Sequence, residues 1–183
     1  KLIISPGIDF IEGSDPGWSD AAQNKMPHAY KAGSQTELLK AQVDAMPEGG
    51  LFAMVAPPTP YRCPPGPYER VSRDIVVDTL RVDVCNVISA MKAGRIDDSA
   101  WVTDGNWAPV NPGDMSSKFD ADIYILGDAS QQGDMPKSGF SANSQAKVCA
   151  NAVQATLTGS RQFQTRYDNT CRRLIAAADG VKV

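Results

Sequence analysis

The 183-residue sequence is poor in histidine and has no excess of positive charge, and both features exclude classes of function. Its only histidine, His28, argues against a histidine-rich metal site and against a Ser-His-Asp triad. The formal net charge of −3 offers no positive surface to a polyanion, so nucleic-acid binding is not expected. No apolar run approaches the roughly 20 residues of a membrane-spanning helix, and no transmembrane segment is predicted.

Glycine and cysteine motifs are missing as well. The sequence holds no GxGxxG, no Walker A loop, no CxxC and no CxxCH. Without the glycine fingerprint, these residues lack the pyrophosphate cradle of a dinucleotide site. The four cysteines are too few for a disulfide scaffold, their pairing does not follow from sequence, and no metal site is predicted. They are Cys63, Cys85, Cys149 and Cys171.

Apolar runs bounded by turn residues predict an α/β layered fold. The predicted strands are 2–4, 51–56, 82–88 and 119–126, and the predicted helices are 34–46, 141–157 and about 165–178. Residues 51–56 are apolar on both faces, which is typical of a buried strand in a parallel sheet. Ser34 and Glu37 have the spacing of a capping box at the first helix.

A proline-rich loop follows the 51–56 strand, at the point where α/β folds place ligand loops. Six prolines fall within residues 57–67, and Cys63 stands among them. Because proline fixes φ, such a loop could hold a thiol in one place. A thiol held near a flavin can relay electrons or form a sulfur adduct. On the residues alone, an inert cysteine is the better interpretation.

The unit spanning 119–157 carries a second candidate site. Asp128 follows a predicted strand, and the helix beginning near Ser141 directs its positive N-terminus towards the same crevice. An anionic ligand would be stabilised there, with Lys137 as an additional cation. The spacing fits equally well a turn capped by Asp128 and a helix capped by Ser141 with nothing bound. A lone loop lysine such as Lys137 is usually a solvated residue.

Several segments together resemble one known family, the flavoprotein subunit of flavocytochrome c sulfide dehydrogenase. The most specific is Tyr61–Arg70, YRCPPGPYER, which is similar to the family's redox-active cysteine segment. The other similar segments occur in the family's order and are Ser5–Gly7, Pro27–Thr36, Gly127–Ala129 and Met135–Gln145.

The resemblance implies an FAD enzyme of the periplasm that oxidises sulfide and passes electrons to a c-type cytochrome subunit. It implies a partial two-dinucleotide-binding-domain fold, like that of glutathione reductase, with a parallel sheet flanked by helices. Cys63 would be the catalytic thiol. The cofactor-binding residues would be Ser5, Pro6, Gly7, Lys31, Gly127, Asp128, Ala129, Pro136, Lys137, Ser138, Gly139, Phe140, Ser141 and Ala142.

The sequence departs from the family pattern in three places. The family's N-terminal βαβ unit and its C-terminal domain have no counterpart here, and much of its second nucleotide-type domain is absent after the proline-rich loop. The position of the family's second redox cysteine holds Ala108. These departures predict a set of retained segments of a longer protein. Residues 1–47 would belong to the FAD-binding domain and crossover, 48–81 to a remnant of the second domain, and 82–183 to the C-terminal part of the FAD-binding domain.

Two alternatives remain open. One is a flavoprotein like sulfide:quinone reductase, which an amphipathic C-terminal segment facing a membrane would favour. The other is a non-catalytic remnant that binds a cytochrome partner and holds no FAD, which the missing GxGxxG would favour if the chain is complete.

Overall fold

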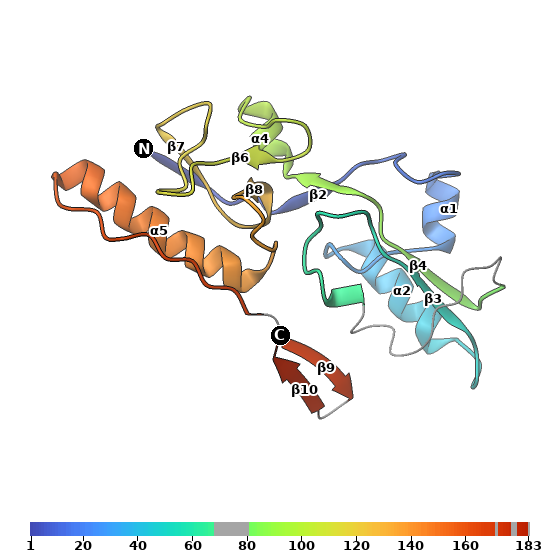
Figure 1. Cartoon of the computed structure of the whole chain (residues 1–183). Helices are drawn as coiled ribbons and strands as arrows, with labels where there is room; N and C mark the ends of the chain where they lie inside the picture. The colour runs from blue at the N-terminus through green and yellow to red at the C-terminus, as the bar shows by residue number, and fades with distance from the viewer. Residues whose placement is uncertain (68–80, 171, 177–178, 183) are drawn as a thin grey trace.

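The computed structural model describes residues 1–67, 81–170, 172–176 and 179–182. Within these residues the strands form two-stranded sheets, three of them parallel (Figure 1). The parallel pairs are β1 (Leu2–Ile4) with β7 (Ile123–Ile125), β3 (Phe52–Val55) with β4 (Val84–Val87), and β6 (Ala108–Pro109) with β8 (Ser130–Gln131). The antiparallel pairs are β2 (Ile8–Phe10) with β5 (Met91–Ala93), and β9 (Arg172–Ala176) with β10 (Asp179–Lys182).

The helices are α1 (Asp20–Lys25), α2 (Ser34–Asp44), α4 (Arg95–Ser99), α5 (Gly139–Thr158) and the short 3-10 helix η1 (Gly127–Ala129). The mixture of helices and parallel strand pairs agrees with an α/β flavoprotein. The specific two-dinucleotide-binding fold and the three-part domain division stay predictions.

The pair β3–β4 corrects one expectation about the sheet. The parallel pairing agrees with the apolar run at 51–56, but Val55 keeps 49% of its surface exposed and Leu51, just before β3, keeps 48%. Helix α2 contacts β4 from one side, and within the described residues neither strand has a second neighbour in its sheet. The strand is therefore half-buried, because one pair of strands cannot enclose both of its faces.

The capping box predicted at Ser34 is wrong. Gly33 is the N-cap of α2, and no side chain caps the helix there. Ser34 is already the first helical residue, and the hydroxyl of Thr36 donates instead to the carbonyl of Lys31, 3.1 Å away. Capping geometry depends on the path by which the chain enters the helix, and the left-handed Gly33, with φ of 143°, sets that path.

The helix predicted near the C-terminus is wrong. A helix was predicted over about 165–178, but residues 159–170 have no regular secondary structure and β9 begins at Arg172. The β9–β10 hairpin stands apart from the other strands in Figure 1. Residues 161–167 instead run back along α5, where the amide of Phe163 donates to the side chain of Asn151 over 2.9 Å. Tertiary contacts with α5 outweigh the weak local helix propensity of this segment.

The buried core lies where β7, β6, β5 and α5 meet. Its fully enclosed members include Ile88, Met115, Ile125, Val102 and Val110. Helix α5 contributes Val148 and Cys149, which is completely buried. This core fixes the end of β7, and with it the turn that carries Gly127 and Asp128. No helix in the described part of the chain has the length and apolar character needed to cross a membrane.

Candidate functional site

The proline-rich loop and the loop before α5 meet at one place. The backbone amide of Cys63 donates to the carbonyl of Lys137 over 2.7 Å. Residues of both loops, together with the ring of Trp107, line a cavity of about 470 Å³. Its walls include Tyr61, Pro64, Trp107, Pro136 and Lys137. The structure thus brings together two segments that the sequence singled out separately, because the Cys63–Lys137 bond ties their backbones to each other.

Gly127 turns the chain directly after β7. Its φ of 74° lies in the left-handed region, where glycine is unstrained. A Cβ atom there would come within 3.0 Å of the Ser5 hydroxyl, which itself donates to the Leu126 carbonyl over 3.2 Å. The Gly127 amide donates to Gln145 Oε1 over 2.8 Å, so the turn is attached to both the end of β1 and helix α5. These contacts hold the Gly127-Asp128 backbone in one position beside α5.

Asp128 is the most informative residue of the site. Its Oδ2 lies 3.4 Å from Arg62 Nε, whereas its Oδ1 is buried and has no hydrogen-bond partner among the described residues. Burial raises the pKa of the carboxyl group more than the nearby cations Arg62 and Lys137 lower it. Buried oxygens are normally hydrogen-bonded, so Oδ1 is a position for a donor such as a hydroxyl group of a ligand.

Lys137 is buried, with 8% of its surface exposed, so it is not a solvated loop lysine. Its ammonium donates to the carbonyls of Asp128 and Ser130 over 2.8 and 2.9 Å. It also lies 3.6 Å from the centre of the Trp107 ring, which provides a cation–π contact. Burial lowers the pKa of Lys137 to about 8, against the opposing effect of Asp128. A cation that releases its proton near neutral pH can respond to charge developing on a ligand.

Cys63 occupies a bend at the exposed side of the same loop. Its φ of 54° is left-handed, and the carbonyl of Cys63 accepts bonds from the amide of Gly66, at 2.8 Å, and the hydroxyl of Tyr30, at 3.4 Å. A Cβ on Gly66 would meet the Tyr30 hydroxyl first and would lie 3.3 Å from the Cys63 sulfur, so glycine leaves room for the Tyr30 side chain beside the thiol. Ala108 is fully buried in β6, next in the chain to Trp107. The thiol is therefore held by backbone bonds on an accessible loop.

The N-terminus of α5 lies at the end of the Lys137 loop. The helix begins at Gly139, and Ser138, rather than Ser141, is its N-cap; the Ser138 hydroxyl accepts from the Ser141 amide over 3.0 Å. The hydroxyls of Ser138 and Ser141 both donate to the side-chain oxygen of Asn169, over 2.7 and 3.0 Å. The helix predicted over about 165–178 gives no indication that Asn169 contacts the start of α5.

Some of the other predicted cofactor residues lie near the Gly127 turn, and others lie near Gly94. Ala129 and Ala142 are beside the Gly127 turn, since Ala129 belongs to η1 and the Ala142 Cβ is 3.7 Å from a Cβ placed on Gly127. Phe140, in the first turn of α5, is 47% exposed. Pro6 packs against Gly94, and the Gly7 carbonyl accepts from the Gly94 amide over 3.0 Å.

Lys31 does not join this cluster. Its ammonium pairs with Asp9 Oδ1 at 2.8 Å, and that pairing lowers the pKa of Asp9. Four residues of the cluster were not foreseen from sequence: Arg62, Tyr30, Trp107 and Gln145. Three of them lie in segments that carry the family resemblance: Arg62 in YRCPPGPYER, Tyr30 in Pro27–Thr36 and Gln145 in Met135–Gln145.

The structure brings together a carboxylate after a strand, a helix N-terminus and a thiol-bearing loop. Comparison with protein families indicates a flavoprotein. Residues 36–83 match the family described as the central part of the flavoprotein chain of sulfide dehydrogenase, flavocytochrome c. The match confirms the resemblance over the stretch that contains α2, β3 and the Cys63 loop. The matched family is a flavoprotein chain, and its name implies a flavin cofactor and a cytochrome partner subunit.

One solved structure with a similar chain is the cryo-EM structure of the mitochondrial ATP synthase of Tetrahymena thermophila. The alignment has 23% sequence identity and a TM-score of 0.44, and covers 55% of this chain and 24% of that chain. The matched part spans about a quarter of that chain's length. Similarity at this level supports no statement about fold or function.

Proposed function

We propose that this chain belongs to the flavin subunit of a periplasmic sulfide dehydrogenase that oxidises sulfide at FAD and passes electrons to a c-type cytochrome. The observation that carries the proposal is the buried Asp128 Oδ1, which lies beside the Lys137 loop and the start of α5 and has no hydrogen-bond partner among the described residues. The family match over residues 36–83 supports it independently, because that match includes Cys63.

The residues present fit a flavin. Asp128 Oδ1 would accept a hydrogen bond from a hydroxyl of the ribityl chain, which supplies the donor that this oxygen lacks. The first turn of α5, beginning at Gly139, would face the pyrimidine edge, where a helix N-terminus favours negative charge. Lys137 would add its positive charge from the preceding loop.

A bound flavin would supply a two-electron acceptor that can return electrons one at a time. The role of the chain is to orient the reactants and to hold protons. Hydrosulfide loses two electrons and one proton when it becomes zero-valent sulfur, and Lys137, with a pKa of about 8, would take up or release a proton in that step. Cys63, exposed on its loop, would carry the sulfur or relay electrons.

The position that holds Ala108 bears on the role of Cys63. The family's second redox cysteine is absent there, so a disulfide exchange between these two positions is excluded by the residue itself. The two electrons of sulfide would then go to the bound flavin without a disulfide between these positions, and Cys63 would either take no part or hold the sulfur transiently. The variant Cys63→Ser separates the two, because unchanged turnover would eliminate the thiol route.

Titration of the purified protein with FAD, followed by its visible spectrum, tests flavin binding. We expect saturable flavin absorption, and sulfide should bleach it under anaerobic conditions. The variant Asp128→Ala should weaken FAD binding about tenfold or more, since it removes a charge-assisted hydrogen bond. Asp20→Ala, which changes an exposed carboxylate in the first turn of α1 outside the lining of this cavity, is the matched control and should bind FAD normally.

The result also separates the proposal from its alternatives. Bleaching by sulfide followed by reduction of added cytochrome c supports the sulfide dehydrogenase. Reduction of a soluble quinone in preference to the cytochrome would favour an enzyme like sulfide:quinone reductase. Failure of FAD to bind, with a cytochrome still captured, would leave the non-catalytic partner-binding remnant.

A further inference from the structure

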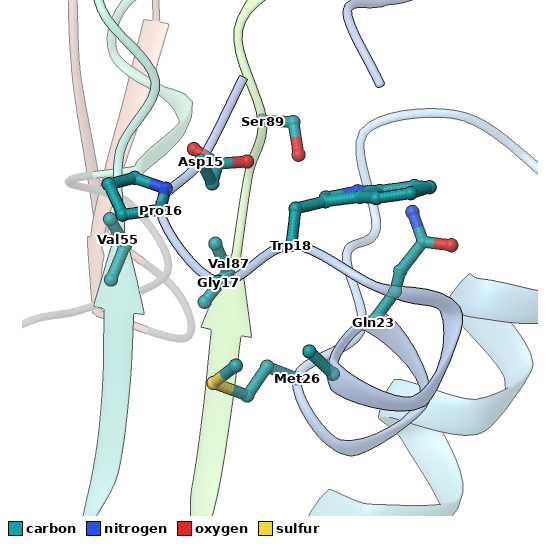
Figure 2. A pocket seen from close by; sticks show the side chains of 10 residues that line it. Asp15, Pro16, Gly17, Trp18, Gln23, Met26, Val55, Val87 and Ser89 are labelled. Carbon is teal, nitrogen blue, oxygen red and sulfur yellow. The ribbon is translucent and has the colours of Figure 1, made fainter. Parts of the chain in front are cut away.

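A second cavity lies on the β3–β4 pair, and none of its lining residues contributes to the Cys63–Lys137 cavity. It has a volume of about 230 Å³ and is enclosed by the chain from Asp15 to Met26 and by Val55 and Val87, the last residues of β3 and β4 (Figure 2). The carboxyl ends of parallel strands are where α/β folds commonly bind small molecules. The cavity therefore lies at a position that is typical of small-molecule sites.

The walls of this cavity are mostly apolar. The side chains of Trp18, Met26, Val55 and Val87 form them, together with Pro16. In Figure 2 the indole ring of Trp18 spans one side of the space and Met26 lies below it. A wall of this kind accommodates an aromatic or branched aliphatic group, whose burial from water is favourable.

Asp15 is the one ionisable residue among those lining the cavity. Its Oδ2 is buried and has no hydrogen-bond partner among the described residues. The buried side chain of Ser89 lies on the same side of the cavity as Asp15 (Figure 2). A carboxylate and a hydroxyl can both accept hydrogen bonds from an ammonium group, and no described cation lines the cavity to neutralise Asp15.

We propose that this cavity binds a small organic cation, a primary ammonium group carried on an aromatic or branched apolar body. The ammonium group donates to Asp15 and lies near the face of Trp18, where a cation is attracted by the ring. The apolar body occupies the space between Met26, Val55 and Val87. This site is separate from the proposed flavin site and does not depend on it.

The charge of the ligand decides between this proposal and a simple apolar pocket. An anion of the same shape would be repelled by Asp15, and a neutral alcohol could donate one hydrogen bond to it but would lack the attraction between opposite charges. The matched probes are 2-phenylethylammonium, 2-phenylethanol and phenylacetate. They share an aromatic body and differ in charge, so the comparison needs no mutation of the protein.

The readout is the indole N–H signal of Trp18 in two-dimensional ¹H–¹⁵N NMR of the 183-residue protein. The three tryptophans give three such signals, and Trp18→Phe identifies the one that belongs to Trp18. We expect 2-phenylethylammonium to shift this signal saturably and to leave those of Trp101 and Trp107 unchanged. The alcohol should bind about tenfold more weakly or worse, and phenylacetate should not bind.

The variant Asp15→Asn removes the charge and keeps the shape of the side chain. It should weaken the binding of the ammonium probe about tenfold and change that of the alcohol much less, and retained binding of the alcohol also reports that the pocket is intact. Asp20→Asn makes the same charge change in the first turn of α1, outside the cavity lining, and should have no effect. The proposal is overturned if the Trp18 signal does not move, if the alcohol binds as tightly as the ammonium, or if the two variants behave alike.

Discussion

The ammonium nitrogen of Lys137 lies 3.6 Å from the centre of the Trp107 ring and donates to two backbone carbonyls at the same time. Lys137 belongs to the loop before α5, Trp107 immediately precedes β6, and the carbonyls belong to η1 and β8. One buried cation therefore joins four pieces of chain around the candidate flavin site. The proline-rich loop is attached to the same point through the amide of Cys63.

Replacing Lys137 by methionine should destabilise the protein by about 1–3 kcal/mol at pH 7, because the carbonyls of Asp128 and Ser130 lose their donor in a buried place. Urea unfolding followed by circular dichroism measures the change. Lys147→Met, on the exposed face of α5, is the matched control and should change the free energy of unfolding by less than about 0.5 kcal/mol. If the two variants changed the free energy of unfolding equally, the hydrogen bonds of Lys137 would make no net contribution to stability.

The same lysine predicts a dependence of stability on alkaline pH. Folding lowers the pKa of Lys137 from 10.5 to about 8, so between these values the unfolded chain binds more protons than the folded one. Stability from this group should therefore rise by roughly 2–3 kcal/mol as pH increases from about 8 to about 10.5. Unfolding curves at a series of pH values should show this rise relative to Lys137→Met. A constant difference between the two proteins would contradict the lowered pKa.

Asp97 should be a source of instability at neutral pH. It is fully buried in α4, and neither carboxylate oxygen has a partner among the described residues. Burial, with help from neighbouring Asp98, raises the pKa of Asp97 to about 6. The folded state then binds more protons than the unfolded state between about 4 and 6, so the favourable contribution is complete at low pH and is lost as pH rises through that window.

Asp97→Asn should therefore stabilise the protein at pH 7 by about 1–3 kcal/mol, and the gain should disappear near pH 4. Asp98→Asn is the control with the opposite expectation, because Asp98 pairs with Lys92 at 3.2 Å and accepts from Thr103. That change should be neutral or slightly destabilising. Thermal unfolding at both pH values measures the difference, and a gain of Asp97→Asn that persists at pH 4 would point to packing instead of charge.

Gly127 should tolerate alanine worse than Gly133 does. Both residues have left-handed φ angles, 74° and 55°, so both substitutions carry backbone strain of about 1 kcal/mol. Only at Gly127 does the added Cβ meet another group, the Ser5 hydroxyl at 3.0 Å; at Gly133 it meets nothing within 4 Å. The extra loss of stability at Gly127 should shrink when Ser5→Ala is combined with it, as a double-mutant cycle would show. Equal losses at the two glycines would exclude the contact.

Local patterns in the sequence predicted several elements correctly. The apolar runs gave β1, β3 and β4, and the alanine-rich stretch ended by Gly159 gave α5, which begins at Gly139. The proline-rich segment correctly predicted a loop directly after β3, because proline is excluded from central strands. The short β2, the helix α1 and the β9–β10 hairpin were not foreseen, since their few residues carry no clear period.

The candidate site also combines residues that the sequence indicates with contacts that only the fold creates. The sequence alone singled out Cys63, Asp128 and Lys137 as candidate site residues, because motifs and loop positions are local properties of the chain, and the roles of these residues stay predictions. Only the tertiary structure decided that Arg62 pairs with Asp128, that Lys137 is buried on Trp107, and that Asn169 meets the serines of α5. These contacts join residues distant in the chain, and their existence depends on how the core packs. Burial then set the pKa values of Asp97 and Lys137, a property that no local pattern contains, because the cost of desolvation depends on every neighbour that excludes water.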